Sequence, residues 1–377
     1  MKTSENFLLV ADSERDANML YAARLFVPDP FIWARVRGRD HIVMSDLEID
    51  RARIQAPHCR VHSLSKLHKK LRDSGMKRPS LADVTVLLLR ELRVKKVFVP
   101  DNFPLGLAND LAKQKISVTA KRDGFFPTRE LKTPDEIRHL TAALRLTEAG
   151  LAAGIAALRA SKIGKARQLV YRGAALTSER LRAVIDCAVI EAGGLPANTI
   201  VAGGEQGCDP HERGHGPLRA HEPIILDIFP RAAATGYYGD LTRTVVRGRA
   251  SEAVRNIYDT VFAGQQTAFK LMRPGVPTAD VHAAVQKLFE ARGYQTGQRN
   301  GRMEGFFHGT GHGLGLEIHE SPRMGATSPG KLQTGQVITV EPGLYYPGIG
   351  GVRLEDVAVI TAGNPRNLTV APKNLEV

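Results

Sequence analysis

Short apolar runs alternate with helical patterns over the first third of the chain. Residues 7–10 and 41–44 are apolar runs of strand length, and residues 80–93 have the apolar content of a helix that leads into another short run at 96–100. Alternation of this kind is typical of α/β domains. The pattern therefore predicts a small α/β domain with a mixed sheet, which ends at the turn-like segment 123–127.

A strong helix start follows this turn. Thr133 can cap a helix, Pro134 suits the first helical position, and Glu136 stands three residues after the cap, as a capping box requires. The predicted helix continues to about residue 160. Further helices are predicted from 177 to the stop at Gly193-Gly194, at 252–272 and at 278–291.

The strands of the second part of the chain come in pairs. Segments 222–229 and 240–247 are predicted antiparallel neighbours, and 337–341 and 352–360 form another pair. A helix pair followed by a strand pair thus occurs twice. Antiparallel strands with helices on one face predict an α+β domain. We expect an N-terminal α/β domain at 1–128 and the α+β domain at 129–377.

Composition fits this two-domain reading. A chain of 377 residues is too long for one ordinary core, and 43% hydrophobic with 24% charged residues is typical of a soluble globular protein. No continuous apolar run approaches the roughly 20 residues of a membrane span, and the apolar stretch after Met1 is too short for a signal peptide. The scattered cysteines Cys59, Cys187 and Cys208 favour a reducing compartment, so we expect a cytoplasmic protein.

The net charge of +13 raises the possibility of a nucleic-acid partner. Residues 1–124 carry 23 Lys and Arg against 15 Asp and Glu, but the basic residues are dispersed and no aromatic side chains are interleaved with them. This pattern favours a solvated basic surface. We expect neither a nucleic-acid nor a membrane partner.

Potential metal ligands recur through the last 150 residues, each in a strand-like or Gly-rich context. Four carboxylates around one imidazole are too anionic to be buried uncompensated, and two divalent cations would offset their charge. Taken singly, the first two aspartates could be turn or cap residues, but buried glutamates are rare unless paired or metal-bound. The set predicts a dinuclear metallohydrolase. Its members are Asp227, Asp240, His312, Glu341 and Glu355.

Three histidines sharpen this interpretation. His308, His312 and His319 lie in a stretch with four glycines, which allow close backbone approach and make a helical His pair improbable. A structural role as a partly buried imidazole would explain any one of these histidines. It does not explain well why three of them lie so close together among glycines. His211 lies in a predicted loop, where a surface position and a substrate contact fit the local sequence equally well.

At these residues the chain resembles the pita-bread metallopeptidases, which include methionine aminopeptidases, Xaa-Pro aminopeptidases and Xaa-Pro dipeptidases. The resemblance covers about residues 131–377 and includes all five ligand motifs in order. It implies a curved antiparallel sheet with outer helices, preceded here by a smaller creatinase-type α/β domain. It also implies that Asp227 chelates one metal, that Asp240 and Glu355 bridge both, and that His312 and Glu341 complete the other.

The resemblance further implies the catalytic roles. A metal-bridged hydroxide would attack the peptide bond, with Glu341 as proton acceptor and His319 stabilising the oxyanion. His211 and His308 would border the scissile bond. Arg353 matches an arginine that supports a bridging carboxylate. Oxygen-rich ligation favours Mn²⁺, and Zn²⁺ or Co²⁺ can occupy the same kind of site.

The presence of the N-terminal domain reduces the number of family members that the chain resembles in full. Methionine aminopeptidases generally lack a domain of this size, and creatinases lack the five-ligand set. We therefore expect a homodimer that hydrolyses Xaa-Pro dipeptides, a short proline-containing substrate. Alternatives are a Xaa-Pro aminopeptidase acting on longer peptides and a non-catalytic pita-bread binding protein.

One segment departs from the family pattern. The loop at 229–236 makes the gap between Asp227 and Asp240 longer than expected, so the hairpin turn must absorb extra residues. A similar irregularity precedes Asp227, and we assign the substrate-facing histidine to His211 in preference to His215.

Overall fold

The computed structural model describes residues 5–122 and 124–377 and divides the chain into two compact units, Met1–Arg129 and Glu130–Val377. Residues 1–4, which precede the N-terminal apolar stretch, and Asp123, the first residue of the expected boundary turn, lie outside the described residues.

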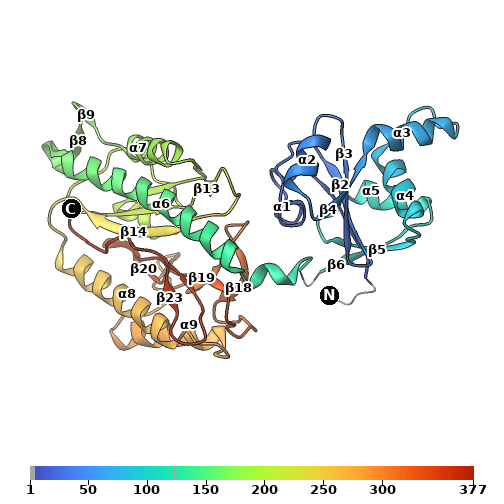
Figure 1. The fold of residues 1–377 in the computed structure, drawn as a ribbon. Helices are drawn as coiled ribbons and strands as arrows, with labels where there is room; N and C mark the ends of the chain where they lie inside the picture. Colours follow the sequence, from blue (N-terminus) through green and yellow to red (C-terminus); the bar gives the residue numbers. More distant parts are fainter. Residues whose placement is uncertain (1–4, 123) are drawn as a thin grey trace. The chain divides into compact units, whose positions relative to one another are not determined.

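The first unit is an α/β domain built on a six-stranded mixed sheet in the order β4-β3-β2-β1-β5-β6 (Figure 1). Strands β1 to β3 are antiparallel neighbours, whereas β3–β4, β1–β5 and β5–β6 are parallel. The strands are β1 Phe7–Ala11, β2 Phe31–Val36, β3 Arg39–Met44, β4 Cys59–Ser63, β5 Lys96–Pro100 and β6 Ser117–Lys121. The helices are α1 Ala17–Ala23, α2 Ile49–Gln55, α3 Leu64–Asp73, α4 Leu81–Glu91 and α5 Leu105–Lys113.

This sheet is buried on both faces, which explains its continuous apolar strands. Along β1, Phe7 and Leu9 pack in one core with Trp33, while Leu8 and Val10 pack in another with residues of α4 such as Leu88. Successive side chains of a strand point to opposite faces, so both sets must be apolar. The predicted strand–helix–strand pattern of this region is confirmed.

The second unit places its strands between two helix pairs (Figure 1). Helices α6 and α7 lie on one side and α8 and α9 on the other. The helices are α6 Pro134–Ala160, α7 Ser178–Glu191, α8 Glu252–Leu271 and α9 Thr278–Ala291. One sheet consists of β11 Ile200–Gly203, β12 Pro223–Ile228 and β14 Leu241–Val246. Another has the order β18 Glu320–Met324, β17 Gly311–Gly313, β19 Val337–Val340, β22 Asp356–Val359 and β23 Arg366–Asn367.

Shorter strands complete the second unit. A hairpin of β20 Gly343–Tyr346 and β21 Gly350–Arg353 lies near the centre, with β21 in contact with β12. The remaining small sheets are formed by β7 Lys162–Ile163, β8 Leu169–Tyr171 and β9 Ala174–Ala175, by β10 Gly194–Leu195 with β13 Arg231–Ala232, and by β15 Gly297–Arg299 with β16 Arg302–Glu304.

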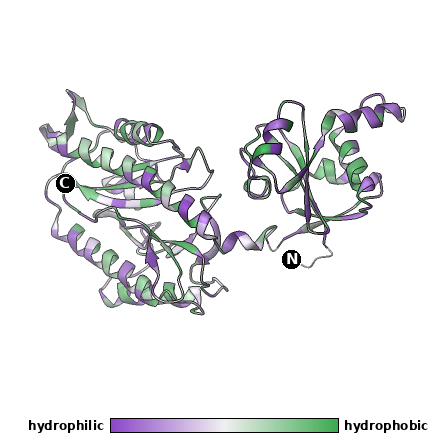
Figure 2. Ribbon diagram, in the orientation of Figure 1, coloured by the Kyte–Doolittle hydropathy of each residue, from purple (hydrophilic) through white to green (hydrophobic). Residues whose placement is uncertain are grey.

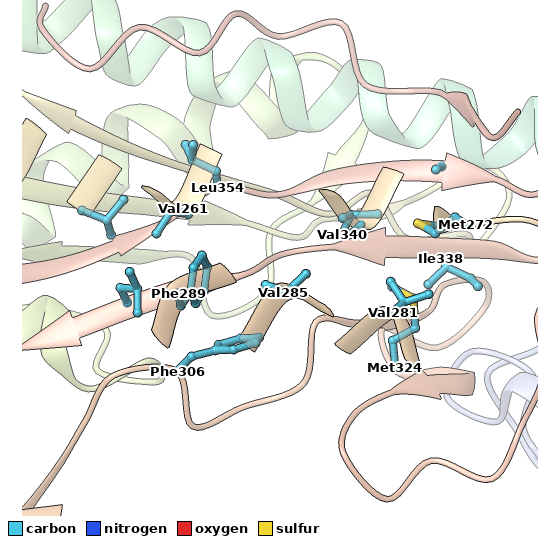
Figure 3. Packing of buried hydrophobic residues seen from close by; sticks show 14 of the residues in the cluster. Val261, Met272, Val281, Val285, Phe289, Phe306, Met324, Ile338, Val340 and Leu354 are labelled. Atoms are coloured by element: carbon cyan, nitrogen blue, oxygen red, sulfur yellow. The ribbon is translucent and has the colours of Figure 1, made fainter. Parts of the chain in front are cut away.

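Each helix pair covers its own half of the strands. Val281, Val285 and Phe289 of α9 pack with Met324 and Ile338 in one core (Figure 3). Residues of α6 and α7 pack on β12 and β14 in a second core. Figure 2 shows both hydrophobic and hydrophilic segments along the helices, as expected for helices with one buried face. The predicted α+β architecture, with a helix pair and a strand pair occurring twice, is confirmed.

Helix α6 begins as its sequence predicts. The Thr133 side chain accepts a hydrogen bond from the Glu136 N–H, and the Glu136 carboxylate accepts one from the Thr133 N–H at 2.8 Å. By length and composition alone, α6 could also cross a membrane. Core helices of soluble domains pass the same test, and the buried Leu151 and Leu158 of α6 pack in the core that contains Leu226.

A buried ion pair ties the segment before α6 to the second sheet. Lys132 Nζ lies 2.6 Å from Glu320 Oε2, and the two side chains are only 2% and 6% exposed. Glu320 also accepts a hydrogen bond from the Glu317 N–H at 3.2 Å, so its carboxylate organises the loop that enters β18. The Lys132 N–H donates to Gly335 O, which fixes the same segment through its backbone.

Replacing Lys132 by methionine is expected to destabilise this unit by about 3–5 kcal/mol, because Glu320 would stay buried without the ammonium ion. Denaturant unfolding of the full chain measures the loss. The double variant K132M/E320Q should recover part of it. Lys69→Met removes an exposed pair with Asp73 and serves as the control with little change. Equal stability of K132M and K69M would contradict this role.

Candidate active site

Asp227 and Asp240 come from one antiparallel hairpin. Asp227 lies within β12 and is paired in register with Thr242 of β14, and Asp240 immediately precedes β14. Asp240 is buried. Side chains two residues apart along a strand point to the same face, so those of Asp240 and Thr242 do so. The loop between the strands contains β13, which pairs with β10.

His312 lies at the centre of the short strand β17, between two glycines that its neighbours require. A Cβ atom at Gly311 would lie 1.9 Å from Thr339 O, and one at Gly313 would lie 2.1 Å from Ser321 O. The strands on both sides therefore approach too closely for any side chain at these positions. Glycine on either side lets β17 hold the buried imidazole of His312 against the other ligands.

Glu341 follows β19, and its N–H donates to Thr310 O at 2.8 Å. Glu355 was expected within a single strand at 352–360, and this expectation is wrong. The strand is broken at Leu354 and Glu355, because β21 ends at Arg353 and β22 begins at Asp356. The Glu355 N–H instead donates to Thr242 O at 3.0 Å, which holds the break against the β12–β14 hairpin.

Four of the five residues lie close together, and Asp227 lines the same cavity. Potential ligand atoms of Asp240, His312 and Glu355 all lie within 4.8 Å of one another. His312 Nε2 is 3.3 Å from Glu341 Oε1 and 3.7 Å from Asp240 Oδ2. The Nδ1 atom of His312 lies 3.1 Å from Gly313 O, so it must carry the proton and Nε2 presents its lone pair to the carboxylates.

Burial of the clustered carboxylates opposes their ionisation unless a proton or a cation relieves it. Burial, reinforced by the neighbouring carboxylates, raises the pKa of Asp240 and of Glu355 well above their ordinary values. Burial also raises the pKa of Glu341 to about 7 and lowers that of His312 to about 4. Glu355 Oε1 is buried with no hydrogen-bond partner among the described residues. An oxygen-rich, anionic donor set with an open oxygen fits divalent cations.

A chain of hydrogen bonds runs from the ligands to the cavity wall. Arg353 Nη2 donates to Asp227 Oδ2 at 2.8 Å, and Nη1 donates to the Tyr345 hydroxyl at 2.9 Å. The Tyr345 hydroxyl lies 2.8 Å from His308 Nε2, while His308 Nδ1 faces Gly309 O and must donate to it. Tyr345 therefore donates to His308, whose pKa burial lowers to about 3.

A cavity of about 720 Å³ opens onto the five candidate ligands. His211, His308 and His319 line it, together with the apolar side chains of Ile200, Phe229, Phe307, Ile318 and Met324. The His319 ring meets the His312 ring edge to face at 4.5 Å. His215 instead lies 3.6 Å from Glu212 Oε1, and it is not among the described residues that line the cavity.

Several residues around the site were not singled out from the sequence. Thr242 Oγ1 donates to Glu355 Oε2 at 2.7 Å, and its two-residue spacing from Asp240 was a usable signal. The cavity is also lined by Arg323 and Asp209. Among the described residues, these two and Arg353 are the charged lining residues that are neither candidate ligands nor histidines. Arg323 is paired in register with His312 across β17 and β18, so both side chains share one face. No local pattern marks Tyr345.

Comparison with known proteins agrees with this geometry. The model of metallopeptidase family M24 matches residues 138–362, more than half of the chain. The uncharacterized peptidase YqhT of Bacillus subtilis is 38% identical over 177 residues, 47% of each chain. A Xaa-Pro dipeptidase of Pyrococcus furiosus is 34% identical over 186 residues, which are 47% of this chain and 49% of that one. The matches thus span about half the length of these relatives.

The whole architecture has a solved counterpart. The crystal structure of an X-Pro aminopeptidase from Thermotoga maritima MSB8 superimposes with a TM-score of 0.83 at 21% identity, covering 99% of this chain and 97% of that one. This likeness confirms the predicted pita-bread fold with its preceding α/β domain. Together with the family match, it shows that the chain belongs to metallopeptidase family M24.

Proposed function

We propose that this protein hydrolyses Xaa-Pro dipeptides and that its activity depends on two divalent cations. The observation that carries this proposal is the lining of one cavity by all five candidate ligands, of which Asp240, His312, Glu341 and Glu355 lie close together, with Asp227 the fifth. The names of the relatives, which include a Xaa-Pro dipeptidase, support the substrate class. Cations bound there would activate a water molecule and polarise the scissile carbonyl.

The proposed proton path uses Glu341. Its carboxylate lies 3.3 Å from His312 Nε2 and lines the cavity, where it would adjoin a water molecule activated by the cations. Glu341 would accept the proton of the attacking water and return it to the prolyl nitrogen, which leaves as an amine. His319 would face the developing oxyanion, and His211 and His308 would border the scissile bond.

Arg353 is proposed to act through Asp227, to which it is hydrogen-bonded, and not through the bridging carboxylate that the resemblance implied. Its guanidinium is held between the Asp227 carboxylate and the Tyr345 hydroxyl, so the orientation of Asp227 is fixed before any ligand binds. Loss of a residue that orients a ligating carboxylate lowers metal affinity by roughly 10–100-fold. Mn²⁺ suits the oxygen-rich set, with Zn²⁺ or Co²⁺ as alternatives.

Preference for dipeptides is proposed to come from Arg323. A dipeptide differs from a longer Xaa-Pro peptide by a free carboxylate directly after proline, and a guanidinium binds carboxylates well. Arg323 shares a sheet face with His312, and its charge acts on the His312 and Glu341 groups. It therefore lies within reach of a carboxylate beside the scissile bond. An aminopeptidase acting on longer peptides remains the second candidate, because the Thermotoga neighbour carries that name.

We further propose that the protein is cytoplasmic and forms a homodimer. The free cysteines Cys59, Cys187 and Cys208 form no disulfide, as suits a reducing compartment.

Asp240→Ala is expected to lower bound metal and abolish hydrolysis of Xaa-Pro while the protein stays folded, because this residue contributes a buried ligand oxygen. Elemental analysis, circular dichroism and turnover in Mn²⁺-replete buffer measure the three effects. Asp259→Ala, an exposed position on α8, is the control. Near wild-type turnover of D240A after chelation and return of Mn²⁺ would rule out the two-cation site.

Glu341→Gln should lower kcat by about 10²-fold or more, since the amide keeps the shape but cannot accept a proton. Some loss of metal is also expected, so turnover is normalised to the metal content of each sample. A variant with unchanged kcat and a raised KM would assign Glu341 to substrate binding alone.

Wild-type protein should hydrolyse Xaa-Pro faster than Xaa-Pro-Yaa or the Xaa-Pro amide, which lack the carboxylate after proline. Arg323→Met should raise KM for the dipeptide by about tenfold, the effect of one charge-assisted hydrogen bond. Arg302→Met removes an exposed guanidinium paired with Glu205 and controls for the change in net charge. If tripeptides are turned over as efficiently as dipeptides, the aminopeptidase function is correct.

A further inference from the structure

One wall of the cavity carries an acidic group that the proposed reaction does not use. Asp209 lies on the loop after the short 3₁₀ helix Gly204–Cys208, and it lines the cavity beside Pro210 and His211. It is exposed, unlike the buried Asp240 and Glu355. Among the lining carboxylates of the described residues, it alone stands apart from the five candidate metal ligands.

The loop holds this carboxylate in a defined position. Asp209 Oδ1 accepts a hydrogen bond from the His211 N–H at 3.0 Å, and the Asp209 N–H donates to Gln206 O at 3.2 Å. The Glu212 N–H in turn donates to Asp209 O. Within the described residues the Asp209 carboxylate accepts only this one hydrogen bond, so oxygen lone pairs stay available to a ligand.

An apolar surface adjoins the carboxylate. Ile200, Phe229 and Phe307 line the cavity and pack in one cluster with Cys208, the residue that precedes Asp209. Apolar surface that ends in a carboxylate suits a long side chain with a methylene stem and a cationic head. Lysine and arginine are the residues with that construction.

The α-ammonium group of the substrate is a poorer match for Asp209. That group is only a few bonds from the scissile peptide bond, which would lie at the cluster of Asp240, Glu341 and Glu355, whereas Asp209 is exposed and lies outside this cluster. A carboxylate on the exposed wall is suited to a part of the substrate that extends away from the bond. The side chain of the residue before proline is that part.

We propose that Asp209 selects substrates in which the residue before proline is lysine or arginine. This specificity rests on the proposed Xaa-Pro hydrolysis, and it names the class of substrate: dipeptides with a cationic residue before proline. Asp209 is a specificity residue that binds the cationic head, while Ile200, Phe229 and Phe307 contact the stem.

The test compares lysyl-proline with norleucyl-proline, which has the stem without the ammonium group. Asp209→Asn keeps an oxygen for the His211 N–H and removes only the charge. The ratio of kcat/KM for lysyl-proline to that for norleucyl-proline should fall by about fivefold in D209N, as expected for one solvent-accessible ion pair. Asp209→Lys should raise the relative kcat/KM for glutamyl-proline.

Glu212→Gln is the matched control. Glu212 lies on the same loop and loses the same charge, but among the described residues it is not part of the cavity lining, and its Oε1 accepts the Gly214 N–H. E212Q should keep the wild-type ratio.

Two results would overturn the specificity proposal alone. One is an unchanged ratio in D209N, and the other is an equal fall for both dipeptides, which would assign Asp209 to the α-ammonium or to the placement of His211. If wild-type protein with Mn²⁺ hydrolyses neither dipeptide, the Xaa-Pro function itself is wrong and the specificity proposal falls with it.

Discussion

The crowding of buried carboxylates around one imidazole is the constraint on which the second unit depends. Asp240, Glu341 and Glu355 are held where burial and mutual repulsion oppose their ionisation. Such an arrangement is costly for a folded chain unless a cation or a proton relieves it. The surrounding structure must therefore be rigid enough to impose it, and both helix pairs contribute to that rigidity through their separate cores.

The two halves of the unit are joined at the site itself. Thr242 and Thr244 of β14 bond to Glu355 and to the backbone of Arg353 through their hydroxyl groups. The buried Arg243 between them binds Asp356 and the carbonyl oxygen of Glu355. Residues from the first strand pair thus position candidate ligands of the second. The cluster of candidate ligands lies where the two halves meet, and its geometry depends on both.

Much of this could be predicted from the sequence, because local signals were strong. The cap at Thr133, the apolar runs of the first unit and the glycines around His312 each have one physical explanation. The break at Glu355 could not be predicted, because contacts distant in sequence hold it: the Glu355 N–H donates to Thr242 O, and Arg243 donates to Glu355 O. Tyr345 and Asp209 were missed for the same reason, because their importance arises from neighbours distant in sequence.

The position of β18 at the edge of its sheet has a consequence for how such a protein can diverge. β17, which carries His312, pairs with a strand on both sides, whereas β18, which carries Arg323, pairs on one side only among the strands of the described residues. A central strand tolerates little change, because each substitution disturbs two neighbours. An edge strand can exchange an exposed side chain at small cost. New side chains can therefore appear at the rim of this sheet, next to the cavity, while the strand that carries His312 stays the same.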